Sequence, residues 1–207
     1  MSNQVAAKQE KAEKAKDESD QIRASSYALI AALLAQSPSE ELLQQLQGIE
    51  TVKDDSKDIV NAWSTLKLAA QRENATTIAD EYHVLFIGLG RGELVPFASW
   101  YLTGFLMEKP LAHLRQRLSE LGFEQQENVH EPEDHAAALC EVMSQLIMDS
   151  EIDFETEREF YEGFLGNWMK RFFSDLQSTE TSSFYRAVGQ LGEAFLDIEN
   201  RYFSMMV

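Results

Sequence analysis

The chain has very little of the residues that build disulfide frameworks, turns or membrane spans. Its 207 residues include one cysteine, Cys140, so no disulfide can form within the chain. There are 4 prolines and 10 glycines, and no run approaches the roughly 20 apolar residues of a membrane-spanning helix. The N-terminus also lacks the apolar core of a secretory signal peptide. These absences predict a protein of a reducing compartment, the cytoplasm, without stable membrane insertion.

Basic residues are scarce as well. The chain holds 18 Lys and Arg against 35 Asp and Glu, which gives a formal net charge of -17. The acidic excess is strongest over 121–160, where twelve acidic residues stand against one basic residue, Arg158. A surface of this sign repels phosphate groups, so nucleic acid is disfavoured as a partner and basic peptides are favoured.

The apolar residues predict an all-α protein. They make up 44% of the chain and recur at three- and four-residue spacing, whereas no segment shows the alternation of a strand. We expect one globular domain of about nine helices over 21–207, preceded by a mobile extension over 1–20 that offers almost no apolar side chain to bury. A polar connector over 122–132 is expected to act as a hinge. The expected helices cover 22–36, 41–47, 56–72, 76–87, 97–108, 111–121, 134–150, 155–176 and 183–203.

Common catalytic and metal-binding patterns are missing from the sequence. The 4 histidines show neither Glu-x-x-His nor His-x-x-x-His spacing. Cys140 lies in an apolar run with carboxylates and no cation nearby, so we expect a buried, unreactive thiol. The glycines of 88–92 follow no predicted strand and precede no Gly-Lys-Ser/Thr. We therefore interpret them as a tight turn at a helix end and not as a phosphate cradle.

The stretch Glu131-Pro132-Glu133-Asp134-His135 concentrates ionisable groups immediately before an apolar helix. In one interpretation Asp134 is the N-cap of a helix that begins at His135, and Pro132 stiffens the approach. In the other interpretation the cluster binds a ligand, because it holds more polar groups than capping requires. The residues alone leave both interpretations open.

This stretch and two others together resemble the TorD/DmsD family of cytoplasmic chaperones for exported molybdoenzymes. The other two are Glu81-Tyr82-His83-Val84-Leu85-Phe86-Ile87-Gly88 and Pro96-Phe97-Ala98-Ser99-Trp100-Tyr101, and all three occur in the family's order and spacing. A further family element resembles 160–172, but Phe164 stands where the family pattern has a histidine. The resemblance covers about 22–203.

The resemblance implies a TorD-like helical fold and a chaperone that is not an enzyme. Such a protein binds the twin-arginine signal peptide and the apo catalytic subunit of a molybdoenzyme, assists cofactor insertion and delays export. The runs 90–96 and 103–106 are most similar to members associated with formate dehydrogenases. No catalytic residue and no metal ligand is expected. The client-binding residues that the resemblance implies are Glu131, Pro132, Glu133, Asp134 and His135 at a polar end, and Tyr82, Phe86, Pro96, Ser99, Trp100 and Tyr101 towards an aromatic groove.

Two rival functions remain open at this point. The chain fits a generic acidic adaptor for basic helical peptides, in which the polar stretch is only a helix cap. A nucleotide-binding hydrolase is the other rival, since some members of the family are linked to guanine nucleotides; no other cofactor is expected. A monomer and a domain-swapped homodimer are both compatible with the sequence, and in the dimer the 122–132 connector would be the hinge.

Overall fold

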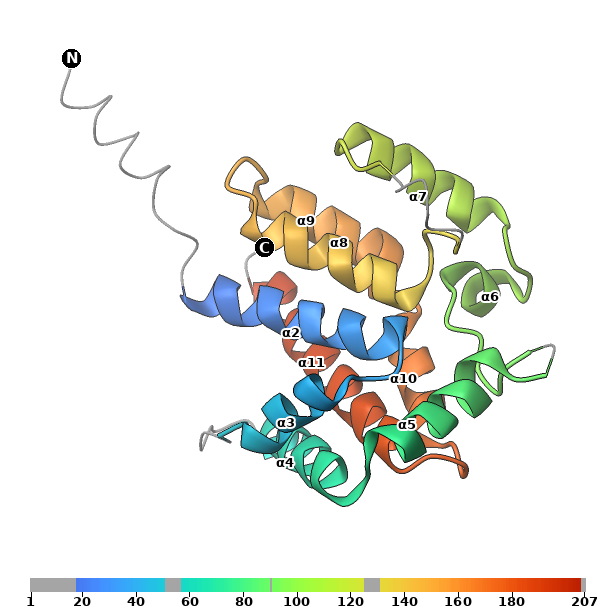
Figure 1. Cartoon of the computed structure of the whole chain (residues 1–207). Helices are drawn as coiled ribbons and strands as arrows, with labels where there is room; N and C mark the ends of the chain where they lie inside the picture. Colours follow the sequence, from blue (N-terminus) through green and yellow to red (C-terminus); the bar gives the residue numbers. More distant parts are fainter. Residues whose placement is uncertain (1–17, 51–56, 90, 125–130, 206–207) are drawn as a thin grey trace, which may run out of the picture.

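The computed structural model describes residues 18–50, 57–89, 91–124 and 131–205. Within these ranges the chain forms ten α-helices and two short π-helical turns, with no strand, so the all-α prediction is confirmed (Figure 1). The elements are α2 (Glu18–Ala35), α3 (Glu40–Gly48), α4 (Lys57–Arg72), α5 (Ala75–Tyr82), η1 (His83–Ile87), α6 (Ala98–Thr103), α7 (Lys109–Glu120), α8 (Ala136–Met148), α9 (Phe154–Phe160), η2 (Tyr161–Leu165), α10 (Met169–Gln177) and α11 (Phe184–Met205).

Some expected boundaries differ from the structure. Helix α2 begins at Glu18, inside the segment expected to be a mobile extension; residues 1–17 lie outside the described part, as does 125–130 in the expected hinge. The single helix expected over 155–176 is wrong, because the chain divides it into α9, η2 and α10. The helix expected over 97–108 is also too long. It ends at Thr103 because Gly104 adopts a left-handed conformation, with φ 82°.

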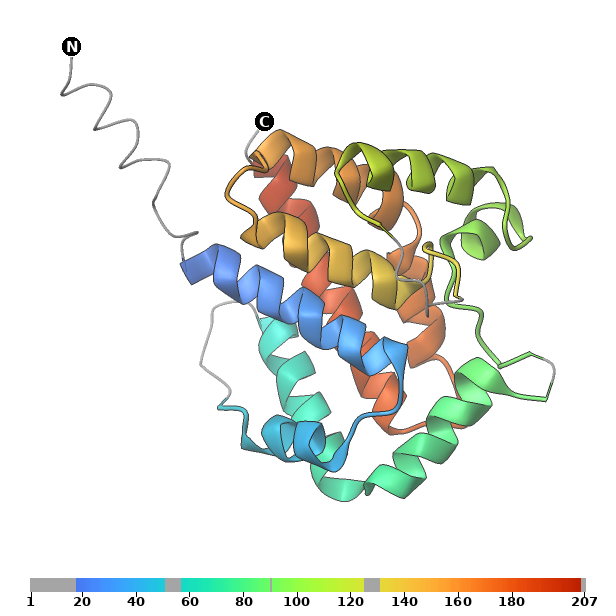
Figure 2. The ribbon, with the colours of Figure 1, turned by 45° about the horizontal axis from the view of Figure 1, so that its top comes forward.

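Helix α11 lies at the centre of the molecule. It packs against α10, α4, α2 and α5, while α2 and α8 lie side by side over it (Figures 1 and 2). The interface of α10 and α11 is unusually close, because a Cβ on Gly192 would lie 2.3 Å from Cε1 of Phe173. Burial of the apolar helix faces supplies most of the stabilisation. The core contains large side chains from most helices, including Leu33, Leu66, Met143, Phe172 and Phe184.

A buried ion cluster joins three of these helices. Arg23 of α2 donates two hydrogen bonds to Glu199 of α11, from Nε at 2.7 Å and from Nη2 at 2.9 Å. Its Nη1 donates to Glu157 of α9 at 3.3 Å, and the guanidinium carbon lies 3.9 Å from the ring centroid of Tyr202. Burial disfavours the charged guanidinium, but the hydrogen bond and the charge of Glu199 raise the pKa of Arg23 above its ordinary value. The cluster fixes the relative positions of α2, α9 and α11.

A second buried carboxylate, that of Glu81 in α5, holds the start of α11. Its oxygens accept hydrogen bonds from the backbone N–H groups of Ser183 at 2.8 Å and Phe184 at 3.0 Å, and from the Ser182 hydroxyl at 2.7 Å. Helix N-termini expose unpaired N–H donors and carry partial positive charge, so a carboxylate from another element can cap them. Glu81 therefore joins α5 to the central helix.

The glycine-rich loop forms the tight turn that the sequence predicts. Gly88 has a φ of 56°, and a Cβ at this position would lie 2.3 Å from the carbonyl oxygen of Arg91. The chain then returns along η1, where the N–H of Leu94 donates to the carbonyl of Leu85 at 2.8 Å. Gly90 lies outside the described residues. This return places Val95 and Pro96 at the start of the segment that leads into α6.

Across the described part of the chain, none of the helices combines the length and the apolar composition that crossing a membrane requires.

Candidate functional site

Two segments that the sequence singled out separately are joined by backbone hydrogen bonds. The N–H of Ala136 donates to the carbonyl of Pro96 at 2.8 Å, and the N–H of Ala98 donates to the carbonyl of Asp134 at 3.0 Å. These bonds form an isolated antiparallel bridge between Phe97 and His135. The starts of α6 and α8 are thereby fixed against each other.

Asp134 caps α6 and not α8, the helix that follows it in the chain. Its Oδ2 accepts a hydrogen bond from the N–H of Ser99 at 2.8 Å, and the residue is 1% exposed. The other carboxylate oxygen, Oδ1, is buried and accepts no hydrogen bond from any described residue. A buried charged oxygen without a partner is energetically unfavourable, so this atom is a candidate acceptor for a ligand. The interpretation of Asp134 as the N-cap of a helix beginning at His135 is wrong, because α8 begins at Ala136.

His135 is the N-cap of α8. Its Nδ1 accepts a hydrogen bond from the N–H of Ala137 at 3.1 Å, and its ring meets the ring of Phe97 edge-on at 5.0 Å. Burial lowers the pKa of His135, against the opposing effect of the negative charge on Glu131. Burial and the hydrogen bond to Nδ1 both favour the neutral imidazole, because a protonated Nδ1 could not accept this bond.

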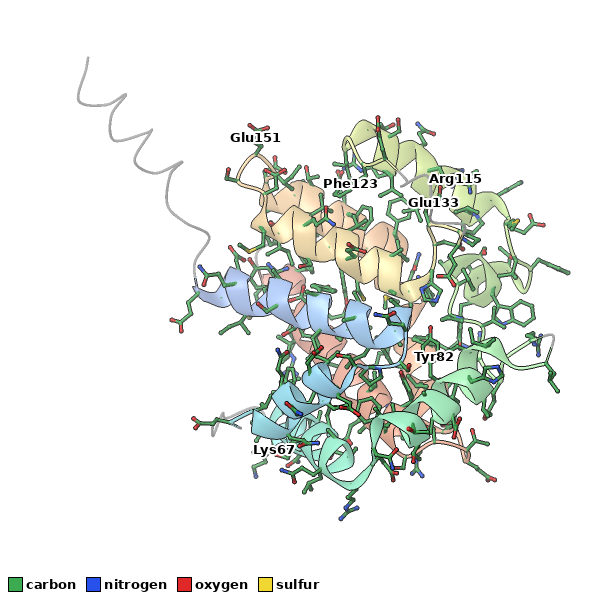
Figure 3. All side chains as sticks on the ribbon, viewed as in Figure 1. Lys67, Tyr82, Arg115, Phe123, Glu133 and Glu151 are labelled. Atoms are coloured by element: carbon green, nitrogen blue, oxygen red, sulfur yellow. The ribbon has the colours of Figure 1, made fainter. Side chains whose placement is uncertain are left out.

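The two glutamates of the polar stretch occupy different surroundings. Glu133 forms an ion pair with Arg115 of α7, in which Arg115 Nη2 lies 2.9 Å from Glu133 Oε2 (Figure 3). Glu131 acts on Tyr82 across space: burial raises the pKa of Tyr82 to about 12, and the charge of Glu131 adds to the effect. The polar stretch thus contacts α7 on one side and approaches α5 on the other.

The predicted aromatic residues form two groups. Tyr82 donates from its hydroxyl to the carbonyl of Ala35 at 2.9 Å, and the rings of Tyr82 and Phe86 pack against Tyr185 of α11. These two residues therefore brace α5 and η1 against the core.

Trp100 and Tyr101 instead line a pocket of about 430 Å³ beside the glycine loop. The guanidinium of Arg91 lies 5.0 Å from the Trp100 ring, and the Tyr101 hydroxyl donates to Asp175 at 3.0 Å. Burial, with the charge of Asp175, raises the pKa of Tyr101 well above its usual range.

A second pocket of about 400 Å³ opens between α6, α7, α8 and η2. Asp134 forms part of its wall, and so does Phe164, at the position where the family pattern has a histidine. Sequence reasoning did not find Lys109, His113 or Asn167 in this wall. Lys109 and His113 belong to no motif, and Asn167 falls at an unspecified position of the family element at 160–172. The packing of α7 and η2 beside α6 brings these residues to the pocket. The lining residues are Ala98, Leu102, Thr103, Lys109, Pro110, His113, Leu114, Asp134, Leu139, Gly163, Phe164 and Asn167.

The chemistry of this region suits binding. Among the described residues, no group of three or more His, Cys, Asp or Glu is placed to hold a metal ion. Cys140 is buried in α8, and burial raises the pKa of its thiol far above the ordinary value. A thiol of this kind is a poor nucleophile. The distinctive polar group is the carboxylate of Asp134, which suits a cationic ligand.

Comparison with known proteins agrees with the resemblance of the motifs. The sequence pattern of the family described as nitrate reductase delta subunit matches residues 53–174, more than half of the chain. The chaperone protein TorD of Vibrio parahaemolyticus is 24% identical over 203 residues, covering 87% of this chain and 94% of the relative. TorD of Photobacterium profundum is 26% identical over 201 residues, covering 86% and 92% respectively. The chain therefore belongs to the nitrate reductase delta subunit (TorD) family.

Proposed function

We propose that this protein is a maturation chaperone for an exported redox enzyme. It binds the twin-arginine signal peptide and the apo catalytic subunit of a molybdoenzyme, with a formate dehydrogenase as the proposed client. Because a leader peptide is read before export, the proposed place of action is the cytoplasm. Family membership and the TorD relatives support a binding role over an enzymatic one.

The observation that carries the proposal is Asp134, a residue of the wall of the 400 Å³ pocket whose buried Oδ1 accepts no hydrogen bond from any described residue. A guanidinium in this pocket would lie beside the carboxylate of Asp134, and a small movement of the pocket wall would let it donate to Oδ1. Hydrogen bonds between charged groups contribute about 1.5–3 kcal/mol, and guanidinium matches carboxylate geometry closely. Lys109 also lines the pocket, but it is exposed, so solvent screens its charge.

The overall charge favours the same ligand. The formal net charge of -17 attracts a basic peptide and accelerates its association. Arg115 neutralises Glu133 on the surface, whereas no described residue donates a hydrogen bond to Oδ1 of Asp134. We therefore assign the arginine-binding role to Asp134 first, with Glu131 and Glu133 as the acidic surroundings.

The proposal is tested by comparing Asp134→Asn with Asp134→Ala in calorimetric titrations with a twin-arginine peptide. Asparagine keeps an oxygen for the Ser99 N–H, so its free energy of unfolding should change by less than about 1 kcal/mol, while the lost charge weakens peptide binding about tenfold. Alanine removes the cap as well and should also lower the free energy of unfolding by about 1–3 kcal/mol.

The control is a peptide whose two arginines are replaced by glutamine, which should bind wild type and Asp134→Asn equally weakly. Unchanged affinity of Asp134→Asn for the arginine peptide would remove Asp134 from the binding site. Failure of the wild-type chain to bind any twin-arginine peptide would contradict the proposed function itself. Co-purification of a molybdoenzyme catalytic subunit from the native host would identify the client and separate the chaperone from a generic adaptor.

A further inference from the structure

Four large apolar side chains are exposed together at the end of α6 and in the turn between α6 and α7. Leu102 is 43% exposed, Phe105 68%, Leu106 47% and Met107 72%. The described chain has eleven exposed large apolar residues, and four of them fall within these six positions. Single exposed apolar residues are ordinary, but a contiguous group marks a surface that contacts another molecule. We call these four residues the apolar loop.

The apolar loop has a defined conformation. The N–H of Gly104 donates to the carbonyl of Trp100 at 2.8 Å, and the N–H of Phe105 donates to the Thr103 hydroxyl at 3.2 Å. Met107 adopts a φ of 59°, the only positive value for a non-glycine residue in the described ranges. A non-glycine residue in this conformation is strained, and it persists where the surrounding structure fixes it. The loop therefore holds its apolar side chains in a fixed, outward arrangement.

The apolar loop adjoins both pockets of the candidate site. Leu102 and Thr103 line the pocket that contains Asp134, and they also line the pocket that contains Trp100. A peptide with an arginine at Asp134 can therefore continue directly onto the loop. The negative carboxylate at one end and the apolar surface beside it match a segment in which a basic residue is followed by apolar residues.

We infer that the apolar loop binds the apolar segment that follows the arginines of the client's leader peptide. This inference rests on the proposed function and extends it, because it assigns the second half of the leader to a surface outside the sequence motifs. Phe105 and Met107 contribute most of the contact, since they are the most exposed members. Association removes their apolar surface from water.

The test compares two double variants of the full chain. Phe105→Ser with Met107→Ser changes the apolar loop; Leu68→Ser with Met148→Ser is the matched control, because both of these residues are 50% exposed and lie on α4 and α8. Each is titrated calorimetrically with a twin-arginine leader peptide and with the same peptide whose apolar segment is replaced by serine and asparagine. Circular dichroism checks that helicity is unchanged.

We expect the loop variant to bind the native leader at least tenfold more weakly than wild type, and with a less negative heat capacity change. The control variant should stay within about twofold of wild type. The polar peptide should bind wild type and the loop variant equally, because its contact with Asp134 is retained. A wild-type affinity of the loop variant for the native leader would overturn the inference and leave the proposed function standing.

Two further outcomes are distinguishable. If wild type binds neither peptide, the proposed function fails and the inference fails with it. If the loop variant has a lower mass than wild type in light scattering but the same affinity for the leader, the apolar loop contacts a second copy of the chain. That result would overturn the assignment of the leader to the apolar loop.

Discussion

Two buried residues at the starts of α6 and α8, Asp134 and His135, each hold a helix end and take part in a second feature of the site. Asp134 uses one carboxylate oxygen to cap α6, and its other oxygen is buried without a hydrogen bond from any described residue. His135 caps α8 through Nδ1 while its ring packs on Phe97. A substitution at either position therefore changes folding and binding together. Variants that preserve the capping bond are needed to measure the two roles separately.

His135 makes the stability of the fold depend on pH. Burial lowers its pKa below the ordinary value of 6.5, so the unfolded chain takes up a proton at a pH where the folded chain does not. The stabilisation is complete above about pH 6.5 and is lost as the pH falls towards the lowered folded pKa. The loss can reach about 1.4 kcal/mol per pH unit for one group.

This dependence is measured by urea unfolding between pH 7.5 and 5, using wild type and His135→Asn. Asparagine accepts a hydrogen bond at an N-cap but does not titrate, so the variant should show a shallower fall of the free energy of unfolding with decreasing pH. Carboxylates other than Glu131, whose charge acts on His135, contribute equally to both curves. The difference between the curves therefore reports the histidine together with this neighbour. Parallel curves would show that His135 keeps its ordinary pKa in the fold.

At the scale of the elements, helix ends are held by side chains from other helices. Glu81 of α5 accepts hydrogen bonds from the first N–H groups of α11, and Asp134 does the same for α6. In the first family motif, 81–88, Glu81 therefore has a structural role at the start of α11. Tyr82 and Phe86 of the same motif brace α5 and η1. These polar groups of the motifs connect elements that are distant in the sequence.

Glu81→Ala should lower the free energy of unfolding by about 2–4 kcal/mol, because it leaves buried N–H groups of α11 without an acceptor. The neighbouring Asp80→Ala is the control; Asp80 is exposed, and its change should stay within about 0.5 kcal/mol. Chemical denaturation of both variants measures the difference. Equal stabilities would mean that water replaces the carboxylate at the start of α11.

At the scale of the whole molecule, the ion cluster around Arg23 decides how α2, α9 and α11 meet. The chain carries a net charge of -17, yet this arginine is buried against Glu199 and Glu157. Removing the cation would leave the buried carboxylate of Glu199 without the arginine that donates two hydrogen bonds to it. The cluster thus ties the N-terminal helix to the centre of the fold.

Arg23→Ala should reduce the free energy of unfolding by about 3–5 kcal/mol, since breaking a buried ion pair leaves an uncompensated charge. Arg115→Ala is the matched control, because its pair with Glu133 lies on the surface, where ion pairs contribute about 0–1 kcal/mol. Urea unfolding at neutral pH measures both. A small effect of Arg23→Ala would show that the two glutamates take up protons when the arginine is absent.

Local patterns in the sequence determine the fold class, most helix positions and the turn at Gly88, because helical periodicity and glycine conformations depend on neighbouring residues. The motifs indicated the family for the same reason: they are short and contiguous. Only the tertiary structure decided that Asp134 caps α6, that Glu81 holds α11 and that Lys109 and His113 reach the pocket of Asp134. The apolar loop also became recognisable only in the fold, since the sequence predicted a helix there. These contacts join residues far apart in the chain, and packing alone brings them together.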